Sequence, residues 1–230
     1  MSIGTGTWDA PLGQDQISKE LCVHFDQARG NRVLVLPAWF DEANKLRRFT
    51  IETMRLLDAA GIDTVLPDLP GCNESVAPLG EQTITSWRDA VEAAQAKFTP
   101  THVLSIRAGA LIAPDGLPGW RYAPQTGAKL LRAMMRARIV AAREAGRAET
   151  TEGLFEQARA KGLTLAGWPF GAAMIAELED AEPLPSASQR DIAATELGGA
   201  GLWLRAEPDE DADQSQALTQ IITADVGTDE

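Results

Sequence analysis

Short apolar runs alternate with longer amphipathic stretches over the first half of the chain. Residues 32–40 have the composition of a buried strand, and residues 43–61 place apolar side chains at helical spacing. A second strand at 62–71, a second helix at 85–98 and a third strand at 101–106 follow. This order predicts an α/β protein whose mostly parallel sheet is covered by helices on both faces. We therefore expect a three-layer αβα sandwich with ligand sites at the carboxyl ends of its strands.

The pattern continues, less regularly, on both sides of this unit. Residues 20–26 alternate like an edge strand, and the turn at 28–32 predicts antiparallel pairing with residues 33–40. Downstream we expect strands at 120–123, 163–171 and 200–207, helices at 128–146, 150–162 and 172–181, a surface connection at 183–189 and a closing helix at 215–223.

A length of 230 residues suits one domain, and no stretch has the composition of an interdomain linker. We expect a single domain over residues 1–230 with an N-terminal extension at 1–19 and a helical cap-like segment at 127–162. Residues 208–230 contain acidic side chains and no basic ones, so we expect this acidic tail region to fray into solvent.

Composition excludes several classes of function. The net charge of −12 opposes binding to nucleic acid and to anionic lipid. No run of apolar residues is long enough to insert into a membrane, and the N-terminus has no signal-peptide pattern, so a cytoplasmic protein is expected. Two Cys and two His provide neither a disulfide framework nor a zinc site of ordinary spacing, and we expect no metal and no cofactor.

The turn after the third predicted strand has the outline of a nucleophile elbow. In G-x-S-x-G elbows, small flanking residues let the helix approach the strand. The corresponding residues here, 105–110, read SIRAGA, and the nucleophile position is Arg107. A guanidinium stays protonated at physiological pH and cannot attack a carbonyl. The segment from Leu204 onward also contains no His that could serve as the distal base, and the helix after the elbow meets Pro114 within about two turns.

These segments resemble a known family. LPAWFDEANKLRRFT, LLDAAGIDTVLPDLPGCNES, the elbow and LAGWPFGAAMIAELEDA are similar to the exosortase A system-associated hydrolase 2 family, over roughly residues 20–205. The resemblance implies an α/β-hydrolase fold, an Arg at the elbow as a property of the group, and a link to bacterial exopolysaccharide and protein-sorting systems. The early Pro114 departs from the long central helix of that fold and implies a scaffold shortened around the elbow.

Arg107 has two interpretations. At the first turn of a helix above a strand end it would favour a small anionic ligand. Alternatively, an internal carboxylate neutralises it, and Asp41, Glu42 and Asp68 follow neighbouring strands. Both hold if the carboxylates orient Arg107 and a ligand completes its contacts.

Other candidates surround this position. Trp39, Phe40 and Ala108, together with Asp41 and Arg107, are the candidate ligand-binding residues, although an aromatic pair after a strand is more often core. The catalytic candidates are Arg107, Asp68 and Glu42.

The remaining polar residues favour structural roles. Ser105 lacks a base, Cys72 is expected to be a free thiol, and the topology places His24 and His102 away from the strand-end cleft.

The predicted helix at 128–146 lies in a basic segment of an otherwise acidic chain. Residues 119–147 hold seven basic side chains and one acidic one, Glu144. The helix either presents a solvated face, covers the cleft, pairs with the acidic tail, or docks a protein partner or a second copy of the chain.

Three functions are consistent with these observations. The leading hypothesis is a catalytically degenerate α/β-hydrolase-like protein, a ligand-binding or accessory component of an exopolysaccharide-linked system. The second is a noncanonical ester or thioester hydrolase in which Asp68 or Glu42 activates water and Arg107 stabilises the oxyanion. The third is an interaction module that docks through the 128–146 helix.

Overall fold

A seven-stranded sheet forms the centre of the molecule. The computed structural model describes residues 3–13 and 16–227. The strands lie in the order β1-β2-β4-β3-β5-β6-β9, and the five from β4 to β9 run parallel. Their bounds are β1 Gly4–Pro11, β2 Ile17–Phe25, β3 Arg32–Leu36, β4 Asp63–Pro67, β5 His102–Ile106, β6 Gly119–Tyr122 and β9 Gln189–Ile192.

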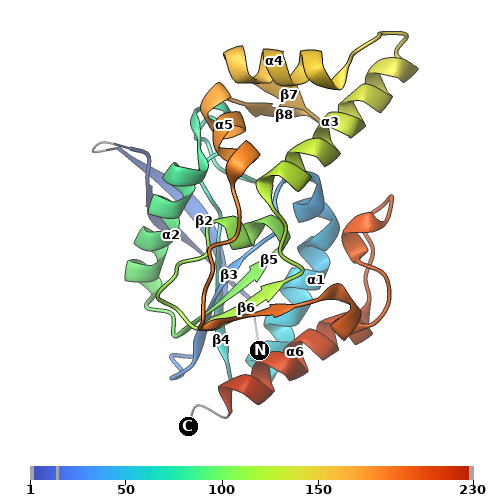
Figure 1. Cartoon of the computed structure of the whole chain (residues 1–230). Coiled ribbons are helices and arrows are strands. Elements are labelled where there is room, and N and C mark those ends of the chain that lie inside the picture. The colour runs from blue at the N-terminus through green and yellow to red at the C-terminus, as the bar shows by residue number, and fades with distance from the viewer. Residues whose placement is uncertain (1–2, 14–15, 228–230) are drawn as a thin grey trace.

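Helices cover both faces of the sheet, as Figure 1 shows. On one face, α1 (Phe40–Ala59) and α6 (Ala212–Val226) pack side by side, and on the other lies α2 (Ile84–Phe98). Alternate residues of β3 follow this division, since Val33 and Val35 pack with α1 and α6, whereas Leu34 and Leu36 pack with α2. The three-layer αβα sandwich predicted from the sequence is confirmed.

The N-terminal pairing differs from the prediction. Residues 1–19 include a strand, β1, which pairs antiparallel with β2. The predicted pairing of residues 20–26 with 33–40 is wrong, because β3 has β4 and β5 as parallel neighbours and has no free edge. The second neighbour of β2 is therefore β4, with Cys22 opposite Pro67.

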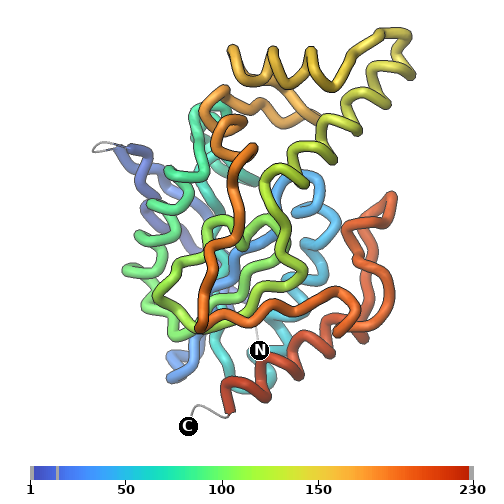
Figure 2. The backbone as a smooth tube through the Cα atoms, in the orientation of Figure 1, coloured from blue at the N-terminus to red at the C-terminus, as the bar shows by residue number. Residues whose placement is uncertain are grey.

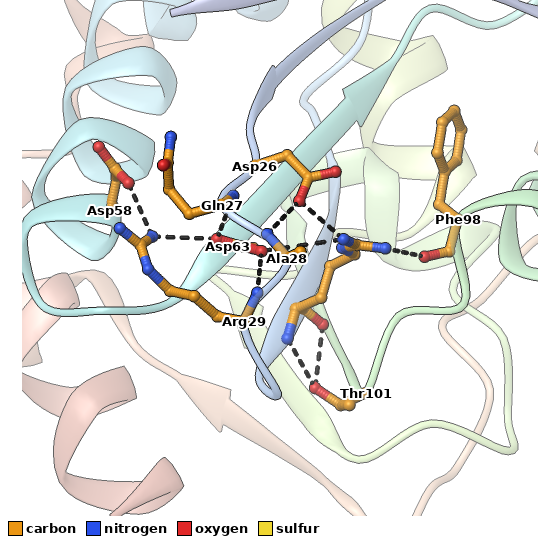
Figure 3. A network of polar contacts seen from close by, with 9 residues as sticks. Asp26, Gln27, Ala28, Arg29, Asp58, Asp63, Phe98 and Thr101 are labelled. Carbon is orange, nitrogen blue, oxygen red and sulfur yellow. Dashed lines mark hydrogen bonds and ion pairs between the residues drawn. The ribbon is translucent and has the colours of Figure 1, made fainter. Parts of the chain in front are cut away.

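A polar network at the amino ends of β3 and β4 fixes the turn between β2 and β3 (Figure 3). The buried carboxylate of Asp63 accepts hydrogen bonds from the backbone N–H groups of Gln27 and Arg29, at 3.0 and 2.8 Å, and from the Arg29 guanidinium at 3.0 Å. Arg29 also donates to Asp58 at 2.7 Å. Every group in this network has a partner within the chain, so its role is structural.

A cap is inserted between β6 and β9, at the carboxyl ends of the strands. It contains α3 (Gly127–Glu144), α4 (Thr151–Lys161), the two-stranded sheet of β7 (Leu163–Leu165) and β8 (Trp168–Phe170), and α5 (Ala172–Asp180). The outer ends of α3 and α4 extend beyond the body of the molecule (Figures 1 and 2). The predicted cap-like segment, 127–162, is helical, and the chain rejoins the main sheet only at Gln189.

In the C-terminal quarter of the chain, two predictions are wrong. The first is the strand at 200–207, which does not form. Residues Leu202–Leu204 form a 3-10 turn, because Gly198 and Gly199 have positive φ angles of 74° and 68° that break an extended run just before it. The last strand is β9, which begins at the end of the predicted surface connection.

The acidic tail is ordered over most of its length. Residues 212–226 form α6, whose side chains Leu218 and Ile222 are fully buried, because the apolar face of the helix packs against α1. The expectation of a frayed tail is wrong for this segment, and residues 228–230 lie outside the described residues.

The remaining short elements are 3-10 turns at Leu79–Glu81, Arg107–Leu111 and Ala194–Leu197. Within the described residues, none of the helices is long and apolar enough to cross a membrane.

Candidate functional site

The elbow after β5 keeps the backbone geometry of a strained strand-to-helix turn. Arg107 has a φ of 55°, in the left-handed region that side chains other than Gly rarely adopt. Two positions on, a Cβ atom at Gly109 would lie 2.4 Å from the carbonyl oxygen of Leu36, so only Gly fits beside β3. The turn continues for only five residues, Arg107–Leu111, which agrees with the shortening predicted from Pro114.

The Arg107 guanidinium is bound by side chains and backbone from neighbouring strand ends. Its Nε and one terminal nitrogen donate to the two carboxylate oxygens of Glu42 at 3.0 and 3.1 Å. The terminal nitrogens also donate to the carbonyl oxygen of Ala123 at 2.7 Å and to Oε1 of Gln125 at 2.9 Å. Gln125 in turn donates to Glu42 at 2.9 Å, which closes a ring of three side chains. This bidentate geometry is the one that suits an Arg–carboxylate pair.

Trp203 closes the site from the loop after β9. The Arg107 guanidinium lies over its ring, with the Cζ atom 4.0 Å from the ring centroid, which is a favourable cation–π distance. We call Arg107, Glu42, Gln125 and Trp203 the Arg107 cluster. Its members lie in the segments that follow β3, β5, β6 and β9: Glu42 is in the first turn of α1, and Trp203 is in the 3-10 turn at Leu202–Leu204. The side chains of Arg107 and Glu42 are only 12% and 16% exposed.

The three carboxylates considered for Arg107 are separated by the fold. Glu42 forms the ion pair. Asp41 is exposed and pairs with Lys45 at 2.8 Å, one turn along α1, so it does not face the elbow. Asp68 is buried at the end of β4 and accepts a hydrogen bond from Asn73 at 2.6 Å instead. Consecutive residues of a helix project about 100° apart around its axis, and in α1 this turns Glu42 toward the elbow and Asp41 toward solvent.

The candidate ligand-binding residues next to the elbow are core residues. Trp39 and Phe40 are 2% exposed and Ala108 is fully buried. Trp39 packs edge-on against Trp87, with 4.8 Å between ring centroids, and Phe40 packs against Phe170 of the cap at 4.7 Å. These aromatic contacts join the sheet, α2 and the cap.

A cavity of about 50 Å³ lies beside this aromatic group, between α1 and the loop after β4. Trp39, Phe40, Asp68, Cys72 and Asn73 are among the residues that line it. A space of that size suits a few water molecules and is too small for an extended substrate.

Burial raises the pKa values of two side chains that line this cavity, Asp68 and Cys72. It raises the pKa of Asp68 above its ordinary value, and the Asn73 hydrogen bond opposes this shift in part. Burial also raises the pKa of the Cys72 thiol to about 12, so at neutral pH the group is a thiol and a poor nucleophile. Both Cys are free, as predicted.

The two His are placed away from the elbow, as the topology predicts. His24 lies on β2, which is separated from β5 by β4 and β3. His102 begins β5, at the opposite end of the strand from Arg107, and its ring stacks on Trp120 with centroids 5.4 Å apart. Ser105 is fully buried within β5. Among the described residues, no group of three or more His, Cys, Asp and Glu side chains is arranged to hold a metal ion.

The sequence missed three members of the site: Ala123, Gln125 and Trp203. Ala123 and Gln125 follow β6, the strand beside the elbow strand, and position alone could have indicated them. Trp203 offered no such signal, since the strand to which it was assigned does not form.

Comparisons with known proteins support the fold. No protein-family model matches the chain, and no curated protein matches it in sequence. Among solved structures, mouse α/β hydrolase domain-containing protein 10 is similar with a TM-score of 0.58 at 12% identity, over 98% of this chain and all of that one. A protein from Agrobacterium vitis S4 gives a TM-score of 0.51 at 16% identity, covering 99% of both chains. A thermophilic esterase from Thermogutta terrifontis gives 0.50 at 13% identity, over 82% of this chain and 79% of the esterase.

At these identities the similarity concerns the fold alone. The strand order and these structural neighbours show that the chain has the α/β-hydrolase fold, and in this chain an internally paired Arg stands at the turn after β5.

Proposed function

We propose that this chain is a catalytically degenerate α/β-hydrolase-like protein with a ligand-binding or accessory role. The observation that carries the proposal is the Arg107 cluster. A side chain that cannot act as a nucleophile occupies the elbow, and Glu42, Gln125 and Trp203 contact it. Neither His lies near enough to serve as a general base.

An accessory role is favoured over capture of an anion at Arg107. The guanidinium already donates four hydrogen bonds within the chain, two of them to a carboxylate. An incoming anion would have to displace Glu42 and leave that carboxylate without its cation, at a cost of several kcal/mol. We therefore expect the Glu42 carboxylate, rather than a small anionic ligand, to occupy Arg107.

The biological setting rests on the family resemblance. Segments between residues 20 and 205 resemble the exosortase A system-associated hydrolase 2 family, and we propose an accessory function in a bacterial exopolysaccharide-linked system. Deleting the gene in its host should change the amount or composition of secreted polysaccharide, and complementation with the wild-type gene should restore it. An unchanged polysaccharide would contradict the link while leaving the proposal about the elbow untouched.

Hydrolysis by a carboxylate-activated water is the second candidate. Asp68 lines the cavity beside Phe40, and its raised pKa makes its ionised form a better base than an exposed carboxylate. In such a reaction the carboxylate takes a proton from water, the hydroxide adds to the ester carbonyl, and the alcohol leaves with that proton. Glu42 is less suited to this role, because both of its carboxylate oxygens already accept hydrogen bonds from Arg107 or Gln125.

One assay separates the two candidates. Purified wild-type protein and the Asp68→Asn and Arg107→Ala variants are incubated with short-chain aryl esters and aryl thioesters at pH 8, and release of the chromophore is followed. We expect no saturable turnover by any of the three proteins above the rate given by bovine serum albumin. Saturable turnover by the wild type would overturn the degenerate assignment, and its loss in Asp68→Asn would identify Asp68 as the base.

A further inference from the structure

Helix α3 carries a line of basic side chains on its solvent face. At about 100° per residue, Lys129, Arg132, Arg136 and Arg143 fall within about 60° of one another around the helix axis. We call these four residues the α3 stripe. All four side chains are exposed. The opposite face is buried in the core through Leu130, Leu131, Met134 and Met135.

No carboxylate of the described chain forms an ion pair with the α3 stripe. Arg138 shows the contrast, because it turns toward β7 and the loop before α4. It donates to Glu149 at 2.8 and 2.9 Å and to the carbonyl oxygen of Thr164 at 2.7 Å. The acidic tail does not cover the stripe either. It forms α6 beside α1, and Glu210 pairs with Arg48 there (Figure 1).

The arrangement costs free energy in the isolated protein. Like charges three or four positions apart on a helix destabilise it, and Lys129–Arg132 and Arg132–Arg136 are such pairs. A bound partner that carries carboxylates along the same line would remove this repulsion.

We propose that the α3 stripe docks an acidic amphipathic helix of a partner protein. The fifteen residues from Lys129 to Arg143 span about 21 Å, the length of a four-turn helix. Beside the stripe, Ala133, Ala137 and Val140 are exposed at i, i+4 and i+7, and Val140 is 57% exposed. Small side chains at this spacing leave room for a second helix at about 8–10 Å.

Charge over the rest of the molecule favours this partner over an extended polyanion. The whole chain has a net charge of −12 although the cap helix is basic, so the remaining surface is strongly acidic. A nucleic acid or an anionic bilayer is a long charged surface that would also meet the acidic body. A single helix is narrow enough to contact the protruding α3 alone (Figure 2).

The test uses two labelled 21-residue peptides of equal composition. In the first, four Glu follow the spacing of the α3 stripe beside a line of Ala and Leu, and in the second the same residues are scrambled. Fluorescence anisotropy measures binding to the full chain at 50 and 300 mM salt. We expect saturable binding of the patterned peptide, at least tenfold weaker binding of the scrambled one, and weakening with salt.

Matched variants locate the binding surface. Arg132→Glu with Arg136→Glu reverses two charges of the stripe, and Arg55→Glu with Lys97→Glu makes the same net change at exposed positions on α1 and α2. The first variant should bind the patterned peptide at least tenfold more weakly, and the second should bind it within about threefold of wild type. Circular dichroism of both variants checks that the fold is retained.

Four results would overturn the proposal. They are equal binding of the two peptides, equal weakening by the two variants, binding of phosphatidylglycerol vesicles or of a 20-base-pair DNA without binding of the patterned peptide, and sedimentation that shows a wild-type dimer abolished by Arg132→Glu with Arg136→Glu. The last result would identify a second copy of this chain as the occupant.

Discussion

Arg107 and the α3 stripe are both cationic, but their surroundings in the folded protein differ. Arg107 is nearly buried, and its guanidinium is bound by a carboxylate, an amide, a carbonyl and an indole ring. The α3 stripe is exposed, and the described chain offers it no carboxylate partner. The difference shows that an Arg at the end of a central strand can have all its contacts within the chain, whereas Arg side chains on an exposed helix face can lack an internal carboxylate partner.

The largest expected effect comes from removing the carboxylate of the Arg107 cluster. Glu42→Gln leaves a nearly buried guanidinium without its counter-charge, and we expect it to lower the free energy of unfolding by about 2–4 kcal/mol. Urea unfolding followed by circular dichroism measures the change. Asp41→Asn, the adjacent exposed acid, is the control and should change stability by about 0.5 kcal/mol or less. Equal effects of the two variants would mean that the Arg107 cluster contributes no more than a surface pair.

Removing the indole that covers Arg107 should have a smaller effect. Trp203→Ala loses the cation–π contact and the edge contact with Tyr122, whose ring centroid is 5.9 Å away. We expect a loss of about 1–2 kcal/mol in the free energy of unfolding. Leu204→Ala, an exposed neighbour in the same loop, should be nearly neutral. If Trp203→Ala is equally neutral, the loop does not seal the elbow.

Burial of the Asp68 carboxyl should make the stability of the protein depend on pH. Because the folded-state pKa of Asp68 is raised, its contribution to stability is greatest below its ordinary pKa and declines as pH rises through the folded value. Asp68→Asn removes this decline, so its melting temperature relative to wild type should increase from pH 4.5 to pH 8. A difference that does not vary with pH would show that Asp68 titrates normally.

The smallest effect is expected at the α3 stripe. Arg132→Gln with Arg136→Gln removes like-charge repulsion and should stabilise the protein by a few tenths of a kcal/mol at low salt. At about 0.5 M salt the difference should disappear, because exposed charges are screened over a few ångströms there. Melting temperatures at the two salt concentrations measure it. A salt-independent loss of stability would mean that the stripe is paired within the fold.

Much of the architecture was predictable from local pattern. The buried strands β3, β4 and β5 and the helices α1 to α5 follow apolar periodicity, which depends on neighbours within a few residues. The predictions that were wrong concern segments whose structure depends on contacts with residues distant in the sequence. An example is β2, which pairs with β4 because β3 already has two parallel neighbours.

The closing helix predicted at 215–223 is confirmed as α6, but the expectation that the acidic tail frays was wrong for a related reason. Acidic composition predicted a frayed end, and the apolar face that includes Leu218 and Ile222 outweighed it by packing on α1. Burial of side chains of this size contributes about 1.5–3 kcal/mol each, which exceeds the repulsion between exposed acidic groups.

For the candidate site, the sequence by itself determined that an Arg stands at the elbow, that no His follows it, and that a basic helix interrupts an acidic chain. Tertiary structure alone decided that Glu42 pairs with Arg107 while Asp41 and Asp68 do not, and that Gln125 and Trp203 complete the cluster. Residue identity fixes what a group can do chemically, but the partner that it meets depends on helix phase and on loops brought together from separate strands.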